Sequence, residues 1–148
     1  PLVAPDPARQ SASGEPVALV IGQPLVGTGL MQRADRDAVS DEIHAWLRQR
    51  GINQIFYKGH PKDPEQELNR PDYQPMTLDE PLEVHLARAS YTAVVGVRSS
   101  ALLFARQTAP ADTAVVAFGW NRIRFKSADE KRQMTNAFRT TGVELIDG

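Results

Sequence analysis

The sequence predicts an α/β fold over residues 16–148, a Rossmann-like parallel sheet of about six strands with helices on both faces. Short apolar runs rich in β-branched residues alternate along the chain with segments of helical periodicity, which is the pattern of βαβ units. The first run, Val17–Ile21, is apolar at every position, as expected for a strand buried on both faces of a sheet. Six strands joined by right-handed crossovers allow the order 3-2-1-4-5-6.

The first half of the chain also predicts one long helix and a second strand. We expect the helix over residues 35–50, capped by Asp35 and ended by Gly51 in the left-handed conformation. Its apolar stripe consists of Val39, Ile43, Trp46 and Leu47. Residues 52–57 form the second strand, and residues 61–75, which contain four prolines, form a polar loop.

The second half continues the alternation of strands and helices. Starting and ending with a strand, the predicted elements cover residues 76–78, 81–89, 91–97, 99–107, 113–118, 127–142 and 143–146. Pro81 falls in the first turn of its helix, where a missing N–H has little effect. Ser127 and Glu130 form a capping box for the last helix, which Gly142 ends.

Length and composition indicate one ordinary globular domain. The chain has 148 residues, of which 41% are hydrophobic and 24% charged. A net charge of −1 gives no reason to expect nucleic acid as a partner. The absence of cysteine excludes disulfides and thiolate metal sites, and no histidine pair has the spacing of metal ligands. Residues 1–15, rich in Pro, Gly and Ser, are interpreted as a flexible linker.

The segment Tyr57-Lys58-Gly59-His60-Pro61 follows the second strand, at the sheet edge where α/β proteins bind ligands. Gly59 allows close approach of the backbone to a ligand, and Pro61 favours an extended His60. Lys58 adds a positive charge. A histidine here can hydrogen-bond a phosphate or donate a proton to a departing one. The alternative is a loop histidine bonded to the backbone.

Three further features belong to the same predicted edge. Ser99 and Ser100 open a helix, where one serine caps the helix and the other hydroxyl is left beside unpaired N–H groups, which favours an anion. Glu83 in the first turn of another helix is either a helix-dipole residue or a ligand for ribose hydroxyls. Gly22 and Gln23 end the first strand and should converge with His60 and Ser99.

The ordered set of motifs resembles bacterial sialyltransferases, in particular the polysialyltransferases of capsule and the sialyltransferases of lipooligosaccharide. The motifs are Gln23-Pro24, Lys58-Gly59-His60-Pro61, Pro81-Leu82-Glu83 and Ser99-Ser100-Ala101-Leu102. The resemblance covers roughly residues 17–118. In those enzymes a His-Pro motif and a later serine pair lie in the carboxyl-terminal, nucleotide-sugar-binding half of a GT-B fold, so the resemblance implies that this chain is such a half.

The resemblance also implies residue roles. His60 would be the catalytic residue, which contacts or protonates the phosphate of CMP-sialic acid as CMP leaves. The residues expected to bind the donor nucleotide are Gly22, Gln23, Lys58, Gly59, Pro61, Glu83, Ser99 and Ser100. Among these, the serines would bind the phosphate, Glu83 the ribose, and the backbone around Lys58 and Pro61 the cytosine. Enzymes of this family use no catalytic metal and no cofactor besides the donor substrate.

In these sialyltransferases the base that activates the acceptor lies in a D/E-D/E-G motif of the amino-terminal half. This chain lacks that motif, since Asp79-Glu80 is followed by Pro81 and Asp147-Gly148 contains one acid. We therefore expect a part of a longer glycosyltransferase that is inactive by itself. Its partners would be the N-terminal domain of the same parent chain and a glycan acceptor. The parent enzyme would be cytoplasmic and peripheral on the inner membrane face.

Two alternatives remain open. The chain can be the donor domain of another CMP-releasing or UDP-sugar transferase, such as a glycerophosphotransferase of capsule or teichoic acid synthesis. It can also be a non-catalytic α/β module that binds a glycan or a protein. In that case Arg122 and Arg124, which alternate along residues 120–126 and are candidate acceptor or anion contacts, would matter more than His60. The same alternation also fits a plain solvent-exposed edge.

Overall fold

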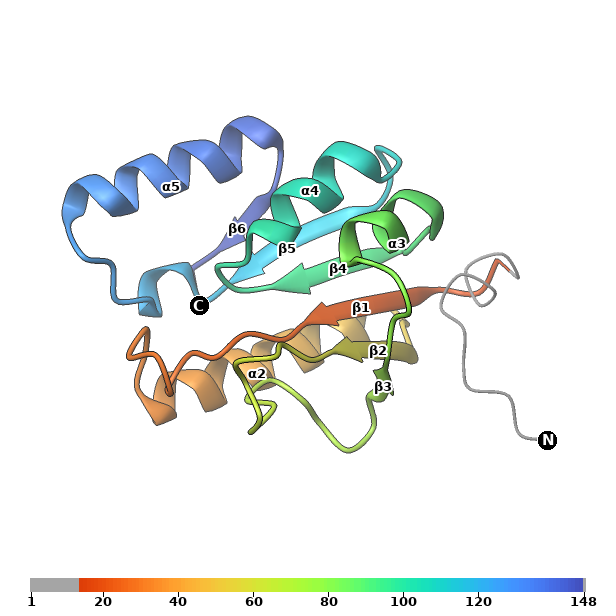
Figure 1. The fold of residues 1–148 in the computed structure, drawn as a ribbon, viewed down its shortest axis with the longest axis horizontal. Helices are drawn as coiled ribbons and strands as arrows, with labels where there is room; N and C mark the ends of the chain where they lie inside the picture. The colour runs from red at the N-terminus through yellow and green to blue at the C-terminus, as the bar shows by residue number, and fades with distance from the viewer. Residues whose placement is uncertain (1–13, 148) are drawn as a thin grey trace.

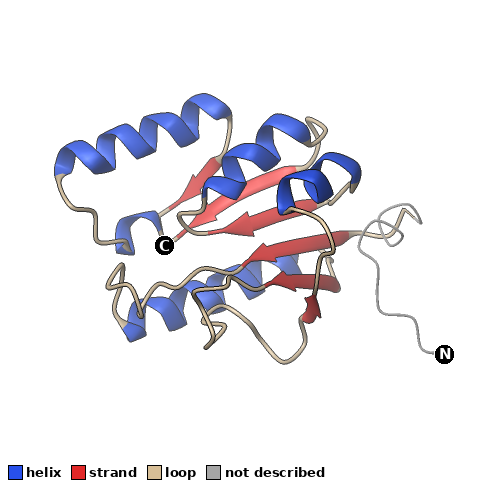
Figure 2. Ribbon diagram, in the orientation of Figure 1, coloured by secondary structure: helices blue, strands red, loops and turns tan. Residues whose placement is uncertain are grey.

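The structure is a computed structural model that describes residues 14–147. The linker expected over residues 1–15 therefore lies almost wholly outside the described residues. Six strands form one sheet in the order β3-β2-β1-β4-β5-β6, and every neighbouring pair is parallel (Figures 1 and 2). The strands are β1 (Val17–Ile21), β2 (Gln54–Lys58), β3 (Gln74–Met76), β4 (Ala93–Gly96), β5 (Ala114–Phe118) and β6 (Glu144–Ile146). The predicted Rossmann-like fold class and strand order are confirmed.

Helices cover both faces of this sheet. Helix α2 (Arg33–Gln49) lies on one face, and α3 (Leu82–Arg88), α4 (Ser100–Thr108) and α5 (Ala128–Thr141) lie side by side on the other (Figure 1). All five residues of the central strand β1 are buried, which explains why its sequence is apolar without alternation. No helix within residues 14–147 has the length and hydrophobicity to cross a membrane.

The helix ends follow the local signals in most cases. Gly51 and Gly142 adopt positive φ values of 73° and 105° just after α2 and α5, as predicted for helix stops. The Ser127 side chain caps α5 by accepting a hydrogen bond from the Glu130 N–H at 3.0 Å. The Glu130 carboxylate accepts from the N–H of Lys126 rather than of Ser127, so the capping box is displaced by one residue.

Several predicted boundaries were wrong, among them the starts of β2 and β4, which lie two residues later than predicted, and the three that follow. Helix α2 starts at Arg33 without a side-chain cap, and Asp35 lies in its first turn and pairs with Arg122 at 2.8 Å. Strand β3 begins at Gln74 rather than at residue 76, because its position follows from pairing with β2 (Phe56↔Gln74). Pro81 is the N-cap of α3 rather than a residue of its first turn. The shifts at Asp35 and Gln74 involve contacts distant in sequence, which a local pattern does not contain.

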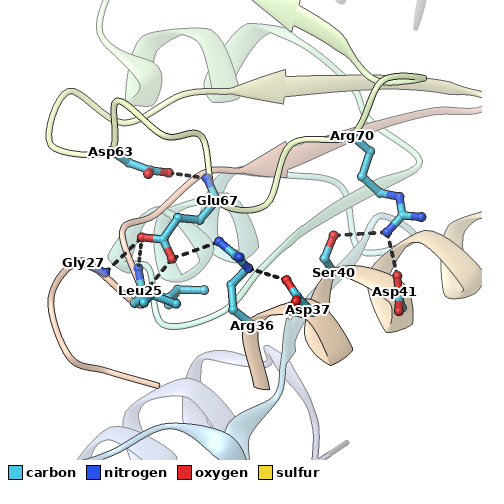
Figure 3. A network of polar contacts seen from close by, with 10 residues as sticks. Leu25, Gly27, Arg36, Asp37, Ser40, Asp41, Asp63, Glu67 and Arg70 are labelled. Atoms are coloured by element: carbon cyan, nitrogen blue, oxygen red, sulfur yellow. Dashed lines mark hydrogen bonds and ion pairs between the residues drawn. The ribbon is translucent and has the colours of Figure 1, made fainter. Parts of the chain in front are cut away.

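The proline-rich loop between β2 and β3 is tied to the loop after β1 by a buried carboxylate (Figure 3). The Glu67 side chain is only 5% exposed. It accepts hydrogen bonds from the backbone N–H groups of Leu25, Val26 and Gly27 at 3.0, 2.7 and 3.2 Å. Arg36 of α2 approaches the same carboxylate to 3.7 Å. The loop after β1 and the loop after β2 are therefore held together at the carboxyl edge of the sheet.

Candidate functional site

A cavity of about 380 Å³ lies at the carboxyl edge of the sheet, where β1, β2 and β4 end. It is bordered by the segment after β2, the start of α3 and the start of α4. Eight residues that the sequence singled out line it, namely Gly22, Lys58, Gly59, His60, Pro61, Glu83, Ser99 and Ser100. The topology thus brings together residues from four separate parts of the chain at the point where the strand order reverses.

His60 is exposed and held by its own loop. Its Nδ1 accepts a hydrogen bond from the backbone N–H of Lys62 at 3.0 Å, and its carbonyl accepts from the N–H of Asp63 at 2.9 Å. Because a backbone N–H can only donate, the neutral imidazole carries its proton on Nε2. This arrangement combines both interpretations of His60, since the ring is bonded to the backbone and still has a donor at Nε2.

Ser99 and Ser100 have different roles at the start of α4. Ser99 is the N-cap, and its Oγ accepts a hydrogen bond from the N–H of Ala101 at 3.2 Å. Ser100 is the first residue of the helix and is exposed, and its hydroxyl has no hydrogen-bond partner among the described residues. The Ser99 hydroxyl keeps its proton for a further bond. Two hydroxyl donors therefore lie at the positive end of a helix dipole, beside the cavity.

Two glutamates line the cavity, and they differ in their surroundings. Glu80 accepts a hydrogen bond from Arg88 Nε at 2.6 Å and lies 3.7 Å from Nδ1 of the buried His85. Glu83 is exposed and has no such partner within residues 14–147. Glu83 is therefore the carboxylate that is available to accept hydrogen bonds from a ligand.

Gly22 allows the closest backbone approach in the site. A Cβ atom at this position would lie 2.4 Å from the Tyr57 hydroxyl and 2.8 Å from the Lys58 carbonyl, so no other residue fits without a shift. The Gly22 N–H donates to that carbonyl at 2.8 Å, one step beyond the β1–β2 pairing. Burial, followed by the nearby Asp63 carboxylate, raises the pKa of Tyr57, and the phenol is therefore neutral at physiological pH.

Three residues that the sequence singled out are not in the cavity. Gln23 instead forms two hydrogen bonds with the backbone of Arg98. Arg122 belongs to a short 3₁₀ helix, η1 (Trp120–Arg122), and is paired with Asp35 at 2.8 Å and Glu42 at 3.7 Å. Arg124 is exposed and likewise does not line the cavity. The segment after β5 is therefore not the plain solvent-exposed edge that the alternating arginines also fitted, because Trp120 within it is buried.

Sequence reasoning missed the apolar part of the site and a second cavity beside it. Leu78, Leu82 and Ala101 line the first cavity, together with Glu80. The second cavity, of about 370 Å³, lies on the other side of the segment that contains His60 and also involves Met76 and Gln66. Their nearness to the end of β2 follows from the loop path, which no local signal indicates.

The chemistry that this arrangement supports is the binding of a phosphate-containing ligand with hydroxyl groups. Two serine hydroxyls at a helix N-terminus and an imidazole N–H suit a phosphate. A free carboxylate suits a diol, and the apolar lining beside it can cover a flat ring. Within the described part of the chain, no three His, Asp or Glu side chains are grouped as metal ligands.

Comparisons with known proteins identify one family. A family model described as alpha-2,8-polysialyltransferase (POLYST) matches residues 4–117, more than half of the chain. No curated protein matches the sequence significantly. Among solved structures, the dehydroquinate dehydratase and shikimate dehydrogenase AroM from S. pombe is similar, with 15% identity and a TM-score of 0.44. That match covers 90% of this chain and 24% of AroM, so the chain spans about a quarter of that protein.

Proposed function

The chain belongs to the alpha-2,8-polysialyltransferase family, and on that premise we propose that it binds the sugar donor CMP-sialic acid at the carboxyl edge of its sheet. One observation carries the proposal. One cavity gathers an imidazole, two hydroxyls at a helix N-terminus and a carboxylate that has no partner within residues 14–147, from elements far apart in the sequence. These are the groups that a nucleoside monophosphate requires for its phosphate and its ribose.

The phosphate is held at the start of α4. Ser99 and Ser100 donate hydroxyl hydrogen bonds to its oxygens, and the helix dipole favours its negative charge. As the bond between the anomeric carbon of sialic acid and the phosphate oxygen breaks, negative charge grows on that oxygen. Donors that are already oriented towards the phosphate stabilise this charge without reorganisation.

His60 assists the departure of CMP. Its Nδ1 accepts a hydrogen bond from the Lys62 N–H. Nε2 therefore carries the proton of the ring and is the nitrogen that can donate to the substrate. As the glycosidic bond breaks, its electron pair goes to the phosphate oxygen, and the Nε2–H of the neutral ring donates a hydrogen bond to the phosphate of CMP. This bond stabilises the negative charge that CMP carries away, and the ring keeps its proton.

The nucleoside occupies the rest of the cavity. Glu83 accepts hydrogen bonds from the two ribose hydroxyls, because it is the lining carboxylate that has no partner among the described residues. The backbone from Lys58 to Pro61 borders both cavities and frames the cytosine ring. The Lys58 ammonium group itself donates to the Gly59 carbonyl at 2.8 Å, so it rigidifies this backbone.

The acceptor hydroxyl requires a base, and the D/E-D/E-G motif that supplies the base in this family is not among the residues that line the cavity. We infer that the base lies in another part of the parent enzyme, which would complete a GT-B fold with this chain as its donor half. The glycan acceptor would bind between the two halves. The parent would act in the cytoplasm, at the inner face of the membrane.

An NMR titration of the chain with CMP tests the proposal. The His60 ring signals and the Ser99 and Ser100 amides should shift on addition of CMP. The ring of His44 on α2, which is hydrogen-bonded to Asp72, is the internal control and should not shift. Titrations with CDP and UDP separate this donor from that of another transferase. The absence of any shift at millimolar CMP would contradict the proposal.

A further inference from the structure

Gln23 lies just beyond β1 and does not line the cavity, although its neighbour Gly22 does. Its side-chain amide contacts the main chain of a single residue, Arg98. The Gln23 Oε1 accepts from the Arg98 N–H at 3.0 Å, and the Gln23 Nε2 donates to the Arg98 carbonyl at 3.1 Å. Both polar groups of the amide are therefore used on the residue that directly precedes Ser99.

The position of this contact follows from the sheet. Strands β1 and β4 pair in parallel with Val20 opposite Val95, so three residues further Gln23 comes opposite Arg98. Beyond the strands the two segments of the chain diverge. The segment after β1 leads to α2 on one face of the sheet, and the segment after β4 leads into α4 on the opposite face (Figure 1). The Gln23 amide continues the pairing across the point where the backbones separate.

We propose that Gln23 is a positioning residue that orients the phosphate-binding serines without touching the ligand. The Arg98 carbonyl belongs to the same planar peptide unit as the Ser99 N–H, so a bond to the carbonyl also fixes the direction of that N–H. The orientation of this peptide sets the start of the N-cap turn, in which the Ser99 Oγ accepts from Ala101. The inference rests on the proposed function of the cavity.

The side chain of Arg98 does not compete for this role. Its guanidinium is directed to α5, where it lies 3.4 Å from Glu130, and it stacks 5.8 Å above the ring centre of Phe125. Only the main chain of Arg98 is therefore held by Gln23. Replacement of the amide should loosen the start of α4 on the side that faces the cavity.

The first test replaces Gln23 with Met, which has a similar length and no hydrogen-bonding amide. CMP affinity, measured by calorimetry on the 148-residue chain, should fall about tenfold, as expected for the loss of hydrogen bonds that orient a charged ligand site. Hydrogen exchange of the Arg98 amide should become faster. Thr92→Val is the matched control, because the Thr92 Oγ1 accepts from the Val17 N–H at 3.1 Å at the opposite end of the same strand pair. That variant should keep its CMP affinity within about twofold.

The second test uses Gln23→Glu and pH. A protonated carboxyl group donates and accepts as the amide does, whereas the carboxylate cannot donate to the Arg98 carbonyl. The CMP affinity of Gln23→Glu relative to Gln23→Met should therefore rise as the pH falls from 7 towards about 4.5, near the ordinary pKa of glutamate. The ratio at each pH removes the titration of the CMP phosphate and of all other groups. A purely structural role of Gln23 in folding would not produce this recovery in affinity.

Two results would overturn the inference. One is a Gln23→Met chain that binds CMP within twofold of the wild-type value, and the other is a Gln23→Glu chain whose relative affinity does not change with pH. If the wild-type chain binds no CMP, the proposed function fails separately. Hydrogen exchange at Arg98 and Ser99 then decides the positioning role, since unchanged exchange in Gln23→Met would exclude it.

Discussion

Ser99 and Ser100 are neighbours in the chain, but only Ser99 has a structural role in addition to lining the cavity. The Ser99 hydroxyl caps α4 and borders the cavity, so it contributes both to the helix and to the site. The Ser100 hydroxyl borders the same cavity and has no hydrogen bond among the described residues. The pair therefore provides an internal comparison between a residue that the fold requires and one that only a ligand would use.

Replacing each serine with alanine should separate these tasks. Ser99→Ala should lower the free energy of unfolding by about 1 kcal/mol, because the cap is lost. Ser100→Ala should change it by less than about 0.5 kcal/mol. Both should weaken CMP binding about three- to tenfold through the loss of a hydroxyl donor. Denaturant unfolding and calorimetry measure the two effects, and a Ser100→Ala chain with unaltered affinity would remove this hydroxyl from the site.

At the scale of elements, the loop between β2 and β3 is ordered by charge rather than by regular structure. Its Glu67 carboxylate is almost fully enclosed and satisfies three backbone N–H groups in the loop after β1. The Glu67 N–H in turn donates to the buried Asp63 at 3.0 Å (Figure 3). Asp63 closes the turn that starts at His60, so the same network supports the segment that lines the cavity.

Glu67→Gln should loosen this loop. An amide offers one acceptor oxygen in place of two and carries no charge, so we expect a loss of about 2 kcal/mol in the free energy of unfolding. Limited proteolysis within residues 61–73 should accelerate. Glu65→Gln is the matched control, because Glu65 lies exposed in the same loop and has no partner in the described structure. Equal proteolysis of the two variants would show that the carboxylate does not hold the loop.

At the scale of the whole molecule, the site depends on the strand order. Because β1 lies between β2 and β4, the segments that follow these strands meet although His60 and Ser99 are far apart in the chain. The cavity opens at the edge of the sheet and is bordered on the far side by the starts of α3 and α4. This chain therefore provides one wall of the reaction site that we propose, and another part of the parent enzyme would provide the opposite wall.

The chain alone should bind the donor without transferring sialic acid. With CMP-sialic acid and an oligosialic acceptor, we expect no elongation of the acceptor, because the acceptor hydroxyl meets no activating base. Calorimetry on the same sample should still detect CMP binding. Transfer to the acceptor, measured by chromatography of the labelled glycan, would show that this chain contains a base. Glu80, a carboxylate that lines the cavity, would then be the first residue to test by substitution.

Features that depend on interactions between near neighbours in the chain were predictable from the sequence. Apolar runs predicted the strands, and Gly51, Gly142 and Ser127 predicted helix ends, because caps and left-handed stops involve groups only a few residues apart. The order of the strands followed from the alternation of elements and the handedness of crossovers. Together these rules predict that His60 and the serine pair lie at one edge of the sheet, and both line the cavity there.

Which side chains lie at that edge and which form other contacts follows from the three-dimensional packing. Gln23 holds the backbone of Arg98, Glu67 occupies the N–H groups after β1, and Arg122 is paired with Asp35. Each of these contacts joins residues between about 40 and 90 positions apart in the chain. Such pairings are selected by the desolvation of charges and amides in the packed fold, which drives each polar group to the nearest partner in space, and no local pattern in the sequence encodes that distance.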